Sequence, residues 1–436
     1  MSAPTGPSRR LPRGASVAFL VVAVLVIGLN QRPAITAIPP IQDVIASDLG
    51  MGPAVTGALT SVPLVCFSLV GLVVPALVRR LGVDRLMLVG LILLGVAVAA
   101  RPWGGAVVLF AGTILVGAAI TIANVLQPVV IRRDVPTRVG TLMPVSTAAL
   151  STGAALASLV AVDLEQWLGW RATLALLAAP IAVAVLLWAV RVRATSGEDA
   201  DPAGTTTTTG STPEPEATKT TGSTPDPEAL VRPSVETYPE RRSAWAEGSS
   251  WWLAAFFGLQ STLFFSAAAW LPSILADRAE ASRSDGGIAL TVYFLLGVVG
   301  ALATPVVVRL LGSYRRASPV PGAGWAIGMV GLLVAPDAWL VWVIVAGAGQ
   351  GMGISLGLTL VAVRPVDVVH GRSVSSMAQS VGYAIAAFGP VVLGRVYGLT
   401  GDWVAGCLLM LGLSIALVVT GFPASSPRPL GLPRGA

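Results

Sequence analysis

Long hydrophobic runs recur along the whole chain, and they restrict its fold more than any other feature. Each run holds about 20 residues, enough for an α-helix to cross the ~30 Å hydrocarbon core of a bilayer. Backbone polar groups in lipid must pair internally, and uninterrupted runs of this length favour helices over the alternating pattern of barrel strands. We predict twelve transmembrane helices, at residues 16–36, 54–78, 86–101, 105–131, 139–163, 171–191, 250–274, 286–310, 318–336, 338–363, 373–397 and 402–422.

The charged residues are few and unevenly placed. Of the 436 residues, 54% are hydrophobic and 11% charged, whereas soluble domains carry about 25% charged residues. The net charge of +6 does not indicate a nucleic-acid partner, because 22 of the 28 Lys and Arg residues fall in segments that would share one side of a bilayer. This bias predicts a multi-pass protein of the plasma (inner) membrane with both termini in the cytoplasm. The opposite loops hold five: Arg101, Arg171, Arg278, Arg283 and Arg395.

A polar segment divides the hydrophobic runs six and six. Residues 194–248 are rich in Thr, Pro, Gly and Glu, a composition that cannot bury a core. We therefore expect a disordered cytoplasmic linker between two bundles. The predicted units are an N-terminal tail (1–14), a six-helix bundle (15–193), the linker (194–248), a second six-helix bundle (249–423) and a C-terminal tail (424–436).

The two halves share a weak internal repeat. PALVRRLGVDR (75–85) and PVVVRLLGSYR (305–315) agree at six of eleven positions at an offset of 230, and the same offset aligns Gly28-Leu29-Asn30 with Gly258-Leu259-Gln260. Parallel six-helix repeats related by an axis along the membrane normal are typical of transporters that hold their substrate between the halves at mid-depth.

The twelve spans and the central linker resemble the major facilitator superfamily. GLNQRPAIT in the first span, NVLQPVVIRR (124–133), LGWRATLAL (168–176) and FFGLQSTLFFSAAAWLPSIL (256–275) are similar to stretches of its cyanate and 2-nitroimidazole permeases. The superfamily motif after the second helix is degraded, since Arg79 stands where an aspartate is expected. The resemblance implies an all-α membrane protein with twelve transmembrane helices in two pseudo-symmetric six-helix bundles. It also implies a cavity lined chiefly by the first, fourth, seventh and tenth helices.

One charge is predicted inside the membrane. Outside the linker, every carboxylate falls in a loop or at a helix end, and the single His370 is expected at the surface of a loop. Arg32 lies within the first span with no predicted counter-ion, so its planar fork suits an anion or strongly polar solute. Pro33 has no N–H, so we expect a kink there, with Arg32 pushed out of the α region and the Leu29 carbonyl freed towards the cavity. The alternative is that Arg32 reaches the lipid headgroups, or that it hydrogen-bonds backbone carbonyls freed by Pro33.

Other polar and aromatic side chains in the spans are candidate contacts. The predicted substrate-binding set is Arg32, Asn30, Gln260, Asn124, Gln350, Gln379, Phe264 and Trp270. The amides could equally form interhelical hydrogen bonds, and the aromatic rings could face lipid.

These features predict a secondary active or facilitative transporter of a small anionic or polar planar solute, working by rocker-switch alternating access. A multidrug efflux pump of the same fold is an alternative, although the spans offer no carboxylate for a cationic drug. A receptor without transport is another, whereas an enzyme is not expected because no catalytic set can be assembled in the spans. We expect no cofactor and no metal, a bilayer-embedded monomer, and a small-molecule ligand; protons as coupling ion remain an open alternative.

Overall fold

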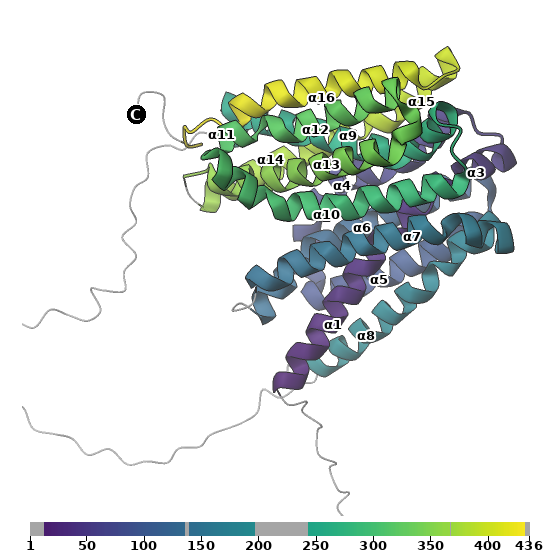
Figure 1. The fold of residues 1–436 in the computed structure, drawn as a ribbon. Coiled ribbons are helices and arrows are strands. Elements are labelled where there is room, and N and C mark those ends of the chain that lie inside the picture. The colour runs from purple at the N-terminus through teal and green to yellow at the C-terminus, as the bar shows by residue number, and fades with distance from the viewer. Residues whose placement is uncertain (1–12, 136–138, 197–242, 367, 432–436) are drawn as a thin grey trace, which may run out of the picture.

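The computed structural model describes residues 13–135, 139–196, 243–366 and 368–431, which are almost entirely helical (Figure 1). The α-helices are α1 (Arg13–Gln31), α2 (Pro33–Thr36), α3 (Gln42–Leu49), α4 (Pro53–Leu81), α5 (Val83–Ala100), α6 (Gly105–Asp134), α7 (Val139–Leu176), α8 (Ala178–Ser196), α9 (Gly248–Arg278), α10 (Arg283–Leu311), α11 (Tyr314–Ala317), α12 (Pro319–Val334), α13 (Trp339–Val363), α14 (Val368–Ala386), α15 (Phe388–Thr400) and α16 (Val404–Ala424). Short 3₁₀ turns are η1 (Pro39–Ile41), η2 (Arg101–Trp103), η5 (Ala244–Ala246) and η6 (Pro336–Ala338).

The predicted helices are confirmed. Eleven stretches of the described chain are long and apolar enough to span a membrane, and the longest, Val145–Arg193, holds two of the predicted spans. Those two meet at Gly169, whose φ of 76° is a left-handed conformation that favours glycine. The eleventh predicted span is divided between α14 and α15, and the first between α1 and α2.

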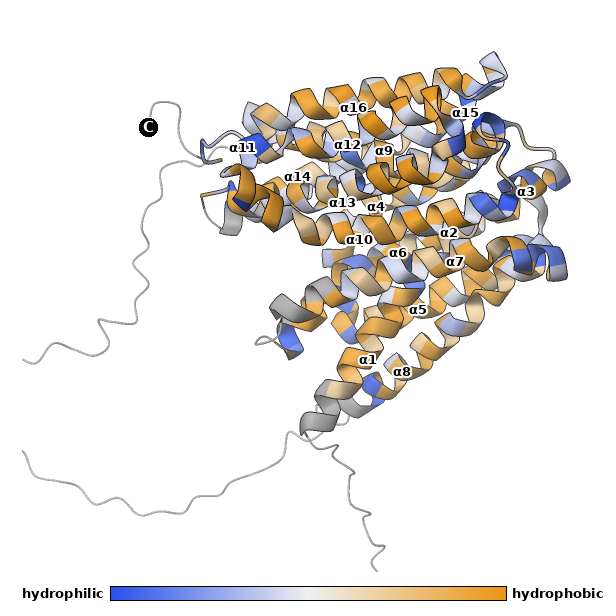
Figure 2. Ribbon diagram, viewed as in Figure 1, coloured by the Kyte–Doolittle hydropathy of each residue, from blue (hydrophilic) through white to orange (hydrophobic). Residues whose placement is uncertain are grey.

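The surface of the helices suits lipid. Figure 2 shows hydrophobic residues along the lengths of the helices and hydrophilic ones mainly near their ends. Large apolar side chains remain exposed on the outside of both halves, for example Leu72, Val96, Leu186 and Leu302, each more than half exposed. In water such a surface would be an aggregation liability, whereas in a bilayer it is the expected exterior. The chain is therefore a multi-pass membrane protein.

The helices form an N-terminal half (α1–α8) and a C-terminal half (α9–α16). We call the end where α1 begins, α8 ends and α9 begins the linker end, and the end that carries α3 the far end. In Figure 1 the two groups of helices meet towards the far end, on the right, and diverge towards the linker end, on the left.

Close backbone packing joins the halves at the far end. A Cβ on Gly57 of α4 would lie 2.5 Å from the Pro390 carbonyl oxygen of α15, and a Cβ on Gly394 would lie 2.5 Å from the Pro53 oxygen. A Cβ on Gly287 of α10 would likewise lie 2.8 Å from a backbone oxygen of α7. Only glycine permits these approaches, so the far-end seal depends on residues without side chains.

Polar contacts between the halves reinforce this seal. Between described residues they are Gln42 to Ser273 (2.8 Å), Ser68 to the Ser380 carbonyl (2.9 Å), Thr291 to the Ala155 carbonyl (3.0 Å), and Arg283 to Asp43 (3.1 Å) and Glu165 (3.3 Å). Gln42, Ser273 and Arg283 lie at the far end, beside α3 and the start of α10, whereas Ser68 lies at the middle of α4. The two halves are therefore closed against each other at that end.

An ion-pair network ties three helices together at the linker end of the N-terminal half. Asp84 at the start of α5 pairs with Arg133 of α6 (2.8 Å) and Arg191 of α8 (3.0 Å), and Arg191 also contacts Asp134 (2.6 Å). Hydrogen bonds from Arg133 to the two carboxylates raise its pKa. The network lies within one half, so it fastens that bundle without joining it to the other.

The last residues of the predicted linker, 243–248, belong to the described part of the chain. Residues 197–242 of the predicted linker and residues 1–12 and 432–436 of the tails lie outside the described residues. Glu247 accepts a hydrogen bond from the Gly431 N–H (3.2 Å). His370 is 5% exposed, with Nε2 3.3 Å from a Glu247 oxygen. The prediction that His370 lies at the surface is wrong, because the return of the chain into α9 and the segment after α16 cover it.

Candidate functional site

The first membrane helix breaks at Arg32, as Pro33 predicts. α1 ends at Gln31 and α2 begins at Pro33, whose missing N–H interrupts the hydrogen-bond ladder. Arg32 itself has φ −101° and ψ −30°. The prediction that Arg32 leaves the α region is wrong. A following proline disfavours this region but does not forbid it, and the more negative φ of Arg32 makes room for the Pro33 ring.

The Leu29 carbonyl has no helical donor because Pro33 lacks an N–H. This carbonyl does not face the space between the halves. It packs against Gly153 of α7, so closely that a Cβ there would overlap its oxygen. The expectation that this carbonyl is freed towards the cavity is therefore wrong. The missing side chain at Gly153 lets α7 cover the break within the N-terminal half.

The Arg32 side chain instead meets the C-terminal half. Its guanidinium carbon lies 5.8 Å from the Phe264 ring centroid and 5.6 Å from that of Phe265, both on α9. These distances fall within the ~6 Å range of cation–π attraction. Arg32 forms no hydrogen bond or ion pair through its guanidinium with the described residues, and Nε is buried without a partner. The charge thus lies between the halves with aromatic rings as its neighbours.

Arg32 also lies deeper than the end of a span. The chain beyond it continues through α2 and η1, and residues 34–41 are all buried. Thr36 of this segment donates to the Ala154 carbonyl (3.2 Å), and its own carbonyl accepts from Ser158 (3.0 Å). Packing on both sides of Arg32 keeps the segment inside the protein, away from the headgroup position of the alternative reading.

An aromatic cluster frames the guanidinium. The Tyr383 ring of α14 lies edge-on to Phe67 of α4 (5.6 Å), Phe257 (5.5 Å) and Phe265 (6.4 Å). Phe265, which also faces the Arg32 guanidinium, links this cluster to Arg32, and the Tyr383 hydroxyl forms no hydrogen bond with a described residue. The sequence marks Tyr383 only as a polar residue in a span; its place beside Arg32 depends on how the halves dock.

The predicted amides of the N-terminal half are mostly engaged elsewhere. Asn30 donates to the Val26 carbonyl of its own helix (2.8 Å). Its neighbour Gln31 donates to Gln127 of α6 (2.6 Å), which in turn donates to Ser146 (2.7 Å). Asn124 is half-buried and has no hydrogen bond to a described residue. Of these side chains, Asn124 therefore keeps a free amide.

The amides of the C-terminal half form their own contacts. Gln260 donates to the Gln350 carbonyl (3.0 Å), while its Oε1 is buried without a partner. The Gln350 amide oxygen packs against Gly297 of α10. Gln379 donates to Ser375 one turn away (2.9 Å). The structure brings Gln260 and Gln350 together but gives neither a contact with Arg32.

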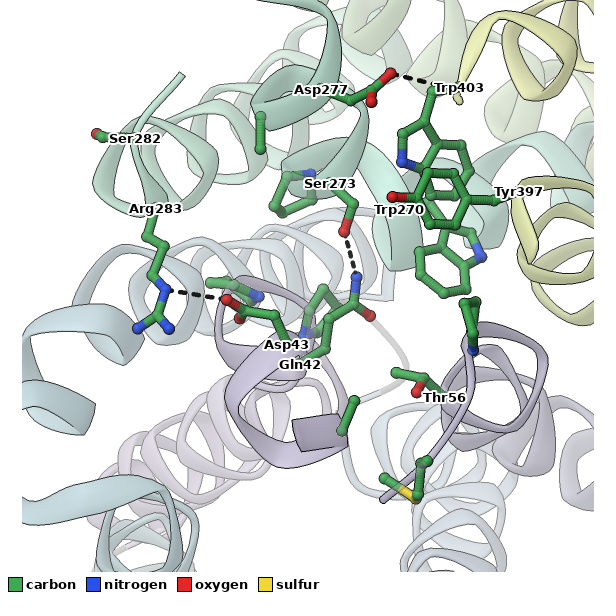
Figure 3. A pocket seen from close by; sticks show the side chains of 17 residues that line it. Gln42, Asp43, Thr56, Trp270, Ser273, Asp277, Ser282, Arg283, Tyr397 and Trp403 are labelled. Atoms are coloured by element: carbon green, nitrogen blue, oxygen red, sulfur yellow. Dashed lines mark hydrogen bonds and ion pairs between the residues drawn. The ribbon is translucent and has the colours of Figure 1, made fainter. Parts of the chain in front are cut away.

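The two aromatic residues predicted to contact the solute, Phe264 and Trp270, lie in different places. Phe264 stacks on Tyr293 at 5.9 Å and adjoins Arg32. Trp270 lies at the far-end seal, where its indole N–H donates to the Pro390 carbonyl (2.8 Å). It lines a cavity of about 360 Å³ between the halves, together with Tyr397 and Trp403 (Figure 3).

That far-end cavity has few free polar groups. Figure 3 shows its Gln42–Ser273 and Asp43–Arg283 pairs and the contact of Asp277 with Trp403. Because these groups already bond one another, the cavity forms part of the closure. Among the described residues, Arg32 is the cation at the interface whose guanidinium has no acceptor, and the ion pairs lie near helix ends.

Two bundles of membrane-spanning helices that close against each other at one end and diverge towards the other are an arrangement typical of membrane transporters. The sequence profile of the Major Facilitator Superfamily matches residues 20–390, and the chain belongs to this superfamily. Its members are transporters rather than enzymes.

Several relatives extend over nearly the whole chain. The uncharacterized transporter YycB of Bacillus subtilis (strain 168) is 30% identical, with 94% of each chain covered. The 2-nitroimidazole transporter of Escherichia coli (strain K12) is 26% identical, covering 95% of this chain and 97% of its own. The cyanate transport protein CynX of the same strain is 25% identical, with 91% and 95% covered. The crystal structure of the D-xylose–proton symporter shares the fold, with a TM-score of 0.70 at 12% identity, covering 96% of this chain and 99% of that one.

Proposed function

We propose that this protein is a secondary active or facilitative transporter of small anionic or polar planar solutes, such as a cyanate-like anion or a nitroimidazole-like heterocycle. Arg32 is the main group that binds the solute. The observation that carries the proposal is the Arg32 guanidinium between the two halves, without a carboxylate or any other hydrogen-bond acceptor among the described residues.

Electrostatics favours an anion at this position. A guanidinium within a membrane helix costs ~2.5–3.5 kcal/mol on insertion scales. The contacts of Arg32 with the Phe264 and Phe265 rings offset part of this free energy, and no described carboxylate pairs with its charge. A solute with a negative charge and acceptor atoms supplies both the missing charge and the missing hydrogen bonds, and the planar fork of arginine suits two acceptors at once.

The surrounding rings favour a flat solute. Phe264, Phe265 and Tyr383 belong to α9 and α14 of the other half, so a solute on Arg32 lies against apolar ring surfaces. The unpaired Tyr383 hydroxyl adds one polar group. The names of two relatives, a 2-nitroimidazole transporter and a cyanate transport protein, fit solutes of this small planar kind.

Alternating access follows from the arrangement of the halves. The far end is sealed by glycine contacts and by Arg283, whereas Arg32 lies further along the interface towards the linker end. If the charge bias of the loops sets the orientation, the linker end is cytoplasmic and this conformation faces the cytoplasm. Rocking of the halves about Arg32 then exposes the solute to the other side.

Uptake by purified protein in liposomes tests the proposal. We expect Arg32→Ala to lower cyanate uptake about 10- to 100-fold, since a charge-assisted hydrogen bond contributes ~1.5–3 kcal/mol. Arg32→Lys retains the positive charge but loses the planar guanidinium. Its cyanate uptake should therefore lie between that of the wild type and that of Arg32→Ala. Uptake of 2-nitroimidazole should decrease less, because that ring carries no full negative charge.

Arg395 provides a matched control, because it is exposed on α15 and its loss removes the same formal charge. Arg395→Ala should transport cyanate as the wild type does. Unchanged uptake of both probes by Arg32→Ala, or an equal decrease in both arginine variants, would rule out Arg32 as the binding group.

A further inference from the structure

A second arginine is buried next to the helix break. Arg101 lies in η2, between α5 and α6, and is only 1% exposed. The sequence places it in an external loop. One of its nitrogens, Nη2, donates to the Ala34 carbonyl at 2.7 Å, while Nε and Nη1 are buried without partners. No described carboxylate pairs with it.

The Ala34 carbonyl has a reason to need this donor. In a continuous helix it would accept from the N–H of Ile38, but that N–H donates to the Ile35 carbonyl instead (3.3 Å), because the chain tightens into a 3₁₀ turn. A buried carbonyl without a donor costs about 1–3 kcal/mol. Arg101 therefore completes the hydrogen bonding of the segment that follows Pro33.

Gly112 fixes where Arg101 can sit. A Cβ added to Gly112 of α6 would overlap the Arg101 Cβ and would lie 3.2 Å from the Arg101 Cα. Any side chain at position 112 would therefore displace the arginine. The arginine is thus wedged between α6 and the broken helix. Both of these contacts, with Ala34 and with Gly112, belong to the N-terminal half.

We propose that Arg101 is a positioning residue for Arg32. Through Ala34, two residues beyond Arg32, it clamps α2 to the N-terminal half. Ser158 and Gly153 of α7 hold the two sides of the same break, at Thr36 and Leu29. Arg32 therefore moves as a rigid part of the N-terminal half, while the C-terminal half meets it only through ring faces. The inference rests on the proposed function, since it assigns Arg101 to the same solute site without contact with the solute.

A double-mutant cycle in liposomes, with cyanate as the probe, tests this role. Arg101→Met keeps an apolar chain of similar length but removes the donor and the charge. We expect it to raise KM at least about 5-fold with a smaller change in kcat, and we expect Arg101→Lys to restore part of the loss. In the Arg32→Ala background, Arg101→Met should change kcat/KM by less than about 2-fold, because there is no guanidinium left to position.

The outcomes separate the two proposals. If Arg32→Ala alone leaves the uptake of both cyanate and 2-nitroimidazole unchanged, Arg32 is not the binding group, and both the proposed site and the role of Arg101 are wrong. If Arg32→Ala impairs uptake but Arg101→Met has no effect, or has the same effect in both backgrounds, only the Arg101 role is overturned.

A second variant covers the case in which Arg101→Met does not fold. Gly112→Ala keeps the arginine but displaces it from Ala34, and it should raise KM in the same way. Gly412→Ala on α16 is the control, because a Cβ there meets no atom within 4 Å. Equal KM values for Gly112→Ala and Gly412→Ala would also contradict the proposal.

Discussion

The guanidinium carbon of Arg32 lies 5.6 Å from the centre of the Phe265 ring, across the boundary between the two halves. The two residues come from different bundles, and the sequence separates them by more than 230 positions. A charge on one half thus faces a quadrupole on the other, a contact that is attractive but lacks the directionality of an ion pair. Such a contact can be left and remade as the halves rock.

Replacing this ring should cost stability in the absence of solute. Phe265→Leu keeps an apolar side chain but removes the ring face, so we expect the free energy of unfolding to fall by about 0.5–2 kcal/mol. Thermal unfolding in detergent measures the change. Phe388→Leu is the control, because Phe388 is 70% exposed on the outside of α15. An equal loss in the two variants would contradict a special contact with Arg32.

Filling the glycine contact at the far end should prevent closure. Gly57→Val would drive carbon atoms into the Pro390 carbonyl and the Trp270 ring, which lie 2.5 and 3.0 Å from the Cβ position. We expect the far end to open and uptake to fall at least about 10-fold. Spin labels at Asp48 and Thr400, one on each half, report the far-end separation.

Gly71→Val is the matched substitution on the same helix. Its Cβ would meet only a Thr121 methyl, at 3.8 Å. It should leave the label distance as in the wild type. If both valine variants shift the distance equally, the effect belongs to α4 in general and the seal does not depend on Gly57.

Removing Arg283 should weaken the same closure by a smaller amount. Its side chain is 44% exposed and pairs with Asp43 and Glu165, and pairs of this kind contribute about 0.2–1 kcal/mol each. Arg283→Gln should therefore shift the population towards far-end opening by a few-fold. High salt should produce part of the same shift in the wild type but little in the variant; equal salt responses would rule out the ion pairs.

The Asp84 network should matter for stability of the N-terminal half. Asp84→Asn removes one of the two described carboxylates that pair with the Arg191 side chain, which is only 12% exposed. We expect a loss of about 1–2 kcal/mol in unfolding free energy, measured by thermal unfolding. Asp163→Asn, at an exposed position of α7, should change nothing. Similar melting temperatures for the two variants would mean that the network contributes no stability.

The degraded superfamily motif shows what the sequence pattern predicts about the turn between α4 and α5 and what it does not. Arg79 replaces the aspartate expected after the second helix, but an aspartate five residues later, Asp84, anchors the ion pairs of this region. The sequence places Asp84 at a helix end. It does not reveal that α6 and α8 end beside it, because that depends on the packing of three helices.

The pseudo-symmetry of the halves is broken at the site. The repeat aligns Arg32 with Thr262, and α9 continues through that position as an unbroken helix while α1 ends. Proline is present in one copy and absent in the other, so the sequence predicts this asymmetry. The hydrogen-bond partners of the amides could not be predicted from the sequence. Asn30 and Gln260 each donate to a backbone carbonyl within their own half.

The sequence by itself determined the membrane fold, the two halves and the break at Pro33, because spans need only length and hydrophobicity and a proline acts on its own helix. The tertiary structure decided which groups satisfy that break, burying Arg101 against Ala34 and Gly153 against Leu29. It also placed Tyr383 and Phe265 around Arg32. These contacts join residues far apart in the chain, and they arise only when the bundles pack and dock, which no local pattern encodes.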